Sequence, residues 1–292
     1  MIQIMSNFAI FTDSACDLSP ELLAQWQVRA VSLNFRFVGN DTLYSDNDMT
    51  SAEFYAQMRE GKIAKTSAVN SETFAQEFEK ELKEGNDVLY VGFSSGLSNT
   101  YNAGRLAAEA LKDAYPDRKI LTVDTLCASA GEGLLLRFAC DKRDAGATIE
   151  EALAHVEALR PRLAHWFTVD DLDYLKRGGR VSPAVAFVGN MLGIKPVLHV
   201  DDEGHLIKRD TVRGRKKAVA ALAQKMVELE ADVENYPIYI SHADCIADAE
   251  YLAGLIKTQF GKDVAVITNV GTVIGAHSGP GTLALFFVAK NR

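Results

Sequence analysis

The chain has 292 residues, of which 48% are hydrophobic and 24% charged, a composition typical of globular proteins rather than disordered, fibrous or disulfide-rich ones. Its 31 basic and 39 acidic residues give a formal net charge of −8, which argues against a protein that binds the phosphate backbone of nucleic acid. The length suggests two domains, or one large α/β unit with an elaboration.

Signals for export, membrane insertion and metal binding are weak. Residues 1–7 lack a basic segment followed by a long apolar run, so we expect no secretory signal. No apolar run approaches the roughly 18 residues that would suggest a membrane span. The four cysteines form no CxxC pair and the six histidines show no ligand spacing, so we expect neither disulfides nor a metal site. These observations predict a cytoplasmic protein.

The first half of the chain alternates short apolar runs with helical patterns, which predicts an α/β domain over residues 1–162 with a doubly wound, mostly parallel sheet. Strands are expected at 8–11, 31–38, 87–92 and 119–123. Helices are expected to begin at Pro20, at Thr50 or Ser51, at Ser71 as a capping residue, and near Asn99.

The pattern changes near residue 162, and residues 163–292 predict a second domain with a mixed α/β sheet. Residues 201–204 have good turn chemistry between two apolar runs, which indicates an antiparallel hairpin of 194–200 and 205–211. Further strands are expected at 164–169, 237–242, 263–268 and 282–289, and helices at 184–192, 215–229 and 247–259. A glycine-rich segment precedes the last strand.

Three segments rich in small hydroxyl residues or glycine are candidates for a binding site. Ser94 and Ser95 follow a strand and precede a helix, where hydroxyls and free backbone N–H groups can bind an anion such as a carboxylate or phosphate. Serines in such a turn can equally serve only to cap the helix. Thr66 lies in a second hydroxyl-bearing loop, and His277 lies among glycines in the other half of the chain.

Residues 92–96 also match the G-x-S-x-G pattern of a nucleophile elbow, in a strand–turn–helix context. Ser94 would then be the nucleophile and His277 the base of a hydrolase. No HGGG-type oxyanion motif precedes the pattern, and spacing singles out no acid. The chain also has no Walker A sequence and no complete GxGxxG, so nucleotide binding is not indicated.

Residues 208–217 are strongly basic within an acidic chain. This segment can be a solvated hairpin end and helix start, or a docking surface for an acidic partner or a phosphate. The residues themselves do not decide between these two interpretations.

Taken together and in order, these motifs resemble those of the DegV family of fatty acid-binding proteins. The matching segments are Phe11-Thr12-Asp13-Ser14, Thr66-Ser67, Ser94-Ser95-Gly96-Leu97-Ser98, Asp124-Thr125, Asp171-Leu172-Asp173-Tyr174-Leu175, Gly178-Gly179-Arg180, Ile194-Lys195-Pro196 and Ile274-Gly275-Ala276-His277-Ser278-Gly279-Pro280-Gly281. The resemblance implies a two-domain α/β protein that is not an enzyme. It would hold one long-chain fatty acid in an apolar tunnel, and would need no cofactor.

The resemblance also implies roles for individual residues. Thr66, the Ser94–Ser95 pair (Ser95 in particular) and His277 would bind the fatty acid carboxylate. The protein would present this carboxylate to a separate ATP-dependent fatty acid kinase, which forms an acyl phosphate for phospholipid synthesis. Arg180, Arg209 and Arg213 would be candidates for docking that kinase.

Three further segments bear on this expectation. The small apolar residues of 184–192 would suit a tunnel wall, although they would suit an ordinary core equally well. The chain departs from the common family pattern at Ala68-Val69-Asn70, where Gln-Pro-Ser is frequent, and at Asn99, where glycine is frequent. We expect these departures to alter the rim around the head group.

Overall fold

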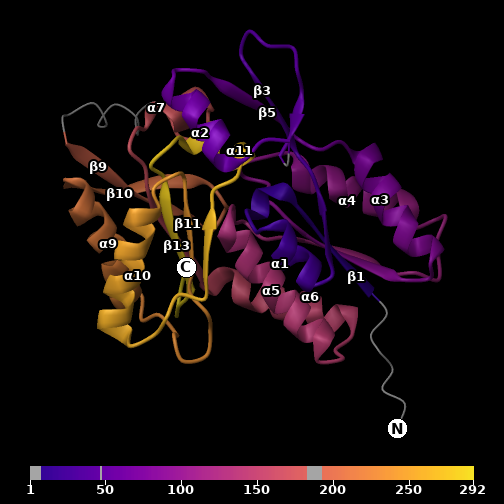
Figure 1. The fold of residues 1–292 in the computed structure, drawn as a ribbon. Helices are drawn as coiled ribbons and strands as arrows, with labels where there is room; N and C mark the ends of the chain where they lie inside the picture. Colours follow the sequence, from indigo (N-terminus) through magenta and orange to yellow (C-terminus); the bar gives the residue numbers. More distant parts are fainter. Residues whose placement is uncertain (1–7, 47, 183–192) are drawn as a thin grey trace.

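The computed structural model describes residues 8–46, 48–182 and 193–292, and Figure 1 shows how its sheets and helices are arranged. Sheet A is fully parallel, with the strand order β2–β1–β6–β7. Its strands are β1 (Phe8–Asp13), β2 (Val28–Val31), β6 (Asp87–Gly92) and β7 (Ile120–Asp124). Strand β6 is buried on both faces, which is why its apolar residues run on without alternation. The parallel sheet predicted for the first half is confirmed.

Sheet C is mixed and has the order β10–β9–β8–β13–β11–β12. In the described ranges, β11 and β12 pair in parallel and the other neighbouring strands of this sheet pair antiparallel. Its strands are β8 (Leu163–Thr168), β9 (Ile194–Val200), β10 (Leu206–Arg213), β11 (Tyr239–His242), β12 (Val266–Asn269) and β13 (Leu283–Val288). Strands β9 and β10 form the antiparallel hairpin expected around residues 201–204. The mixed sheet of the second half is therefore also confirmed.

A small antiparallel sheet, ordered β4–β3–β5, corrects two details of the sequence interpretation. It contains β3 (Asn34–Phe37), β4 (Tyr44–Ser45) and β5 (Ala64–Ser67). The single strand predicted at 31–38 is two strands in different sheets, because the N–H of Leu33 donates to Ser14 Oγ (3.0 Å) instead of continuing a ladder. Thr66, expected in a loop, lies in strand β5.

Helices cover the sheets, and those predicted at 215–229 and 247–259 have observed bounds within one residue of the expected ones, whereas the helices at 173–177 and 272–278 were not predicted. They are α1 (Pro20–Gln25), α2 (Ser51–Arg59), α3 (Ser71–Lys83), α4 (Thr100–Leu111), α5 (Ala130–Asp144), α6 (Ile149–Leu159), α7 (Asp173–Arg177), α9 (Arg215–Glu228), α10 (Ile246–Phe260) and α11 (Thr272–Ser278). Thr50 caps α2 in a capping box with Glu53. Asn70, rather than Ser71, caps α3, since its side chain accepts from Thr73 N (2.8 Å).

The apolar clusters define five layers (Figure 1). Helices α3 and α4 pack on one face of sheet A, and α1, α5 and α6 pack on the other. The same cluster that contains α5 and α6 includes residues of sheet C, whose far face is covered by α9 and α10. Helix α5 therefore lies between the two large sheets and shares its apolar surface with both.

The strands divide near residue 162 as the sequence suggests, with sheet A drawn from residues before it and sheet C from residues after it. Two separate domains remain a prediction, because the apolar cluster around α5 runs through both sheets. The helix expected at 184–192 as a tunnel wall lies outside the described residues. Within the described ranges, no helix is long and apolar enough to cross a membrane.

Candidate functional site

A cavity of about 280 Å³ lies where the carboxyl ends of the sheet A strands meet sheet C. The strand order reverses between β1 and β6, which is the point where open α/β sheets place their ligands. The loops after β6 and β7 supply one wall, and β8, β11 and β13 supply another. The lining is mostly apolar and includes Phe93, Leu97, Ala128, Phe167, Leu175, Leu206, Val270, Val273, Ile274 and Ala284.

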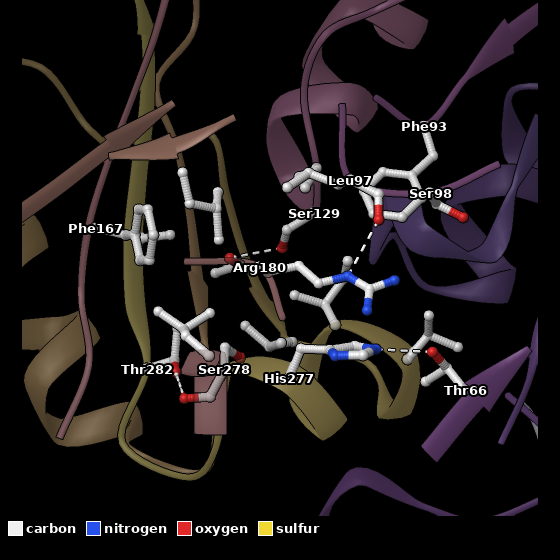
Figure 2. A pocket seen from close by; sticks show the side chains of 18 of the residues that line it. Thr66, Phe93, Leu97, Ser98, Ser129, Phe167, Arg180, His277, Ser278 and Thr282 are labelled. Atoms are coloured by element: carbon white, nitrogen blue, oxygen red, sulfur yellow. Dashed lines mark hydrogen bonds between the residues drawn. The ribbon is translucent and has the colours of Figure 1, made fainter. Parts of the chain in front are cut away.

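Thr66 and His277 meet on this lining although they are 211 residues apart in the chain. Thr66 Oγ1 on β5 lies 2.7 Å from His277 Nε2 on α11 (Figure 2). Burial, with the nearby Arg180 charge, lowers the pKa of His277 to about 4, so the ring is neutral near pH 7. His277 Nδ1 has no partner in the described part of the chain. A neutral ring can pair with Thr66 in either tautomer: when Nε2–H donates, the Thr66 hydroxyl proton is free for a ligand, and when Thr66 donates to Nε2, the Nδ1–H is the free donor.

Arg180 brings a positive charge to the same end of the cavity. Its Nε donates to the carbonyl of Leu97 (3.2 Å), and its guanidinium also donates to the carbonyl of Gly178. Burial lowers the pKa of Arg180, and among residues 8–46, 48–182 and 193–292 no carboxylate forms an ion pair with it. A partly buried cation without an acidic partner favours an anionic ligand, because the ligand would supply the missing charge.

Helix α11 is held in place by side chains from the first half of the chain. Asp46 accepts from both the backbone N–H (3.0 Å) and the hydroxyl of Thr272, at the start of the helix. Tyr55 donates its hydroxyl to the carbonyl of Val270 (2.8 Å). A Cβ at Gly178 would lie only 2.3 Å from His277 Nδ1, so a glycine is needed where α7 ends beside the imidazole. These contacts fix the position of His277.

A second, outer pocket of about 450 Å³ shares Thr66, Arg180 and His277 with the cavity. Lys65 and Arg177 add two more cations to its lining. The three shared residues therefore separate an apolar interior from a basic exterior pocket. A ligand with a long apolar part and one anionic end fits this arrangement, with the anion at Thr66, Arg180 and His277.

The serines after β6 are divided by the fold. The Ser94 side chain is buried and donates to the carbonyl of Gly204 (2.9 Å), and Ser95 is exposed; neither lines the cavity. Ser98 does line it, with its hydroxyl 2.9 Å from that of Thr100. Sequence reasoning concentrated on the first two serines and missed Ser98. Its place two residues before the start of α4, where its hydroxyl accepts from Thr100 N (3.2 Å), was the signal that could have found it.

The Ser94–His277 pair of the hydrolase alternative is not assembled in the structure. The Ser94 hydroxyl is bonded to Gly204, and the partner of His277 is Thr66. A nucleophile and its base must lie within hydrogen-bond reach, directly or through one water. Among the described residues, Ser94 and His277 form no side-chain hydrogen bond with each other.

The three predicted docking arginines lie in two places. Arg180 is at the cavity, whereas Arg209 and Arg213 are exposed on β10, the edge strand of sheet C. At the rim, Ala68 and Asn99 line the cavity. Asn70 instead caps α3, so its side chain already has a structural partner.

Comparison with known proteins decides the family. A model of the "uncharacterised protein, DegV family" matches residues 7–290. A DegV domain-containing protein of Clostridium perfringens is 40% identical over 291 residues, covering 99% of both chains. The chain belongs to the DegV family.

Solved structures of DegV relatives share the whole fold. A DegV family protein from Thermus thermophilus, described by its fatty acid binding, has a TM-score of 0.85 at 30% identity and covers 97% of this chain and 99% of its own. A stearic acid-binding protein from Eubacterium ventriosum has a TM-score of 0.87 at 27% identity, covering 97% and 98%. These DegV relatives are named for binding fatty acids and not for an enzymatic activity.

Proposed function

We propose that this DegV protein binds one long-chain fatty acid, with the acyl chain in the 280 Å³ cavity and the carboxylate at Thr66, Ser98, Arg180 and His277. The observation that carries the proposal is the Arg180 guanidinium, which has no acidic partner among the described residues, beside the Thr66–His277 bond at the mouth of an apolar cavity. Ser98 takes the place expected for Ser94 and Ser95, because it is the serine of that segment on the lining.

The energetics of the two ends support this ligand class. Each buried methylene contributes roughly 0.8 kcal/mol, so a tail of about 16 carbons can provide most of the affinity. The head group contributes less affinity but fixes direction, since the Arg180 guanidinium at that end of the cavity can pair with a carboxylate.

The proposal is tested by titrating the delipidated chain with hexadecanoic or octadecanoic acid and comparing two serine variants. Ser98→Ala should weaken binding by about tenfold, the lower end of the range for one hydrogen bond to a charged group. Ser95→Ala is the matched control, because Ser95 is exposed and off the lining, and it should leave affinity unchanged. Equal effects of the two variants would place the carboxylate elsewhere.

We further propose, from the family resemblance, that the protein is cytoplasmic and presents its fatty acid to an ATP-dependent kinase for acyl phosphate formation. The basic outer pocket, with Lys65, Arg177 and Arg180, supports this because a phosphoryl donor would approach the carboxylate from that side. Arg209 and Arg213 remain candidate docking residues. We expect a fatty acid kinase to form acyl phosphate only when this protein is added, and to form less of it with an Arg209→Ala/Arg213→Ala variant. Acyl phosphate formation without the protein would contradict the role.

A further inference from the structure

The cavity carries hydroxyl groups that a plain acyl chain would not use. Ser129, Ser241 and Ser278 line it from three different elements, and each is at most 5% exposed. Figure 2 shows Ser278 on the opposite side of His277 from Thr66, away from the proposed head-group site. Ser278 therefore lies toward the part of the cavity where the tail would run, and Ser129 and Ser241 lie on the lining of the same cavity.

Ser129 and Ser241 form a short relay with a buried carboxyl group. Ser129 Oγ lies 2.8 Å from Ser241 Oγ and is also bonded to Asp17 Oδ2, while Asp17 Oδ1 accepts from Gly271 N (2.9 Å). Burial raises the pKa of Asp17 well above its ordinary value, and the charges of Asp46 and Asp13 add to the effect.

The relay does not use all of the hydrogen-bonding capacity of the Ser241 hydroxyl group. Ser129 has one hydroxyl proton and two oxygen contacts, with Asp17 Oδ2 and with Ser241 Oγ. If Ser129 donates to Asp17, Ser241 donates to Ser129 and its lone pairs have no donor within the relay; if Ser129 donates to Ser241, the proton of Ser241 has no acceptor within the relay. Ser241 is the member on sheet C, and it lines the cavity.

Ser278 adds a second hydroxyl of the same kind. Its oxygen is buried and has no hydrogen-bond partner in the ranges that the structure describes. Its backbone carbonyl accepts from Thr282 Oγ1 (3.0 Å), and the carbonyl of Thr282 lies beside β11, where Ala243 N donates to it (2.8 Å). Ser278 and Ser241 therefore belong to the same end of the β11–β13 pair. Leaving such hydroxyls against methylenes is unfavourable, and an oxygen on the ligand would satisfy them.

We propose that the preferred ligand is a fatty acid with an oxygen function, in particular a hydroxyl group, within its acyl chain, bound by Ser241 and Ser278. This inference rests on the proposed function, because it assigns a substrate class to the same cavity. The hydroxyl group of the ligand accepts a hydrogen bond from one serine and donates one to the other. A purely apolar tunnel would bind a hydroxylated chain more weakly than a plain one, whereas this cavity should bind it more tightly.

The test compares octadecanoic acid with a series of hydroxyoctadecanoic acids whose hydroxyl is placed at successive carbons through the middle of the chain. Affinities are measured on the delipidated full chain by displacement of a fluorescent fatty acid. A hydroxyl buried without a partner should weaken binding by about tenfold or more. We expect most isomers to show that loss, and at least one to bind as tightly as octadecanoic acid or more tightly.

Serine variants link the effect to the proposed residues. Ser241→Ala and Ser278→Ala should each weaken the favoured isomer by about fivefold and leave octadecanoic acid unaffected or slightly tighter. Ser95→Ala, exposed and off the lining, is the control. A uniform loss for every isomer overturns the inference, as does an equal effect of the serine variants on both ligands. If a variant does not fold, the isomer series on the unaltered chain decides. Binding of neither octadecanoic acid nor its hydroxy isomers would instead contradict the proposed function itself.

Discussion

Replacing Arg180 with leucine tests the electrostatic part of the site. The guanidinium lies at the boundary between cavity and outer pocket, and no carboxylate pairs with it in the described residues. A hydrogen bond between charged groups contributes about 1.5–3 kcal/mol, and the lower end applies here because Arg180 is only half-buried. Each 1.4 kcal/mol is tenfold in affinity, so Arg180→Leu should weaken fatty acid binding by about tenfold.

The assay should compare a fatty acid with the fatty alcohol of the same length. The alcohol has the same tail but no negative charge, so its affinity should change by less than about twofold in Arg180→Leu. Arg209→Leu removes an exposed arginine of β10 and is the matched control. The free energy of unfolding should fall by no more than about 2 kcal/mol, the value of the lost bonds to the carbonyls of Leu97 and Gly178. Unchanged affinity for the acid, or an equal loss for acid and alcohol, would refute the reasoning.

Three further changes test other parts of the account. Gly178→Ala should displace the His277 ring, since the new Cβ would lie 2.3 Å from Nδ1, and it should weaken fatty acid binding by about tenfold. Gly254→Ala is the control, because a Cβ there has open space around it and should leave affinity unchanged. Equal affinities of the two variants would show that the position of the ring is unimportant. Ser94→Ala removes the bond to the carbonyl of Gly204, so it should lower the free energy of unfolding by about 1 kcal/mol in urea titrations and leave fatty acid binding unchanged. Loss of an ester-hydrolysis activity in this variant would favour the hydrolase instead. Burial lowers the pKa of His165 far below its usual value, so the contribution of the neutral ring to stability is complete above about pH 6.5 and is lost as the pH falls. His165→Phe should therefore reduce the slope of the unfolding free energy against pH, below about pH 6.5, by up to about 1.4 kcal/mol per pH unit. An unaltered slope would count against a neutral buried ring.

The layers of the fold were predictable because they follow from local patterns. The continuous apolar run of β6 indicates a parallel strand buried on both faces, and the turn at 201–204 indicates the β9–β10 hairpin. The division of 31–38 into two strands was not predictable, since it depends on a hydrogen bond from Leu33 to Ser14 in a distant loop. The same holds for α11, whose first turn is held by Asp46.

The candidate site shows the same limit. Thr66 and His277 were identified by residue type, yet only the fold shows that their side chains are in contact. Arg180 was expected on a docking surface because the sequence shows its charge but not that, in the part of the chain that the structure describes, no carboxylate pairs with it. Ser98 was missed because three serines in one turn look alike until the fold buries one against Gly204, exposes another and leaves the third on the cavity lining.

The most direct test of the central claim is native mass spectrometry of the purified full chain, before and after removal of lipid. The account predicts a protein that carries the added mass of one long-chain fatty acid, loses it on delipidation and regains it when hexadecanoic or octadecanoic acid is supplied. A chain that is empty when purified and takes up no fatty acid, hydroxylated or plain, would contradict it.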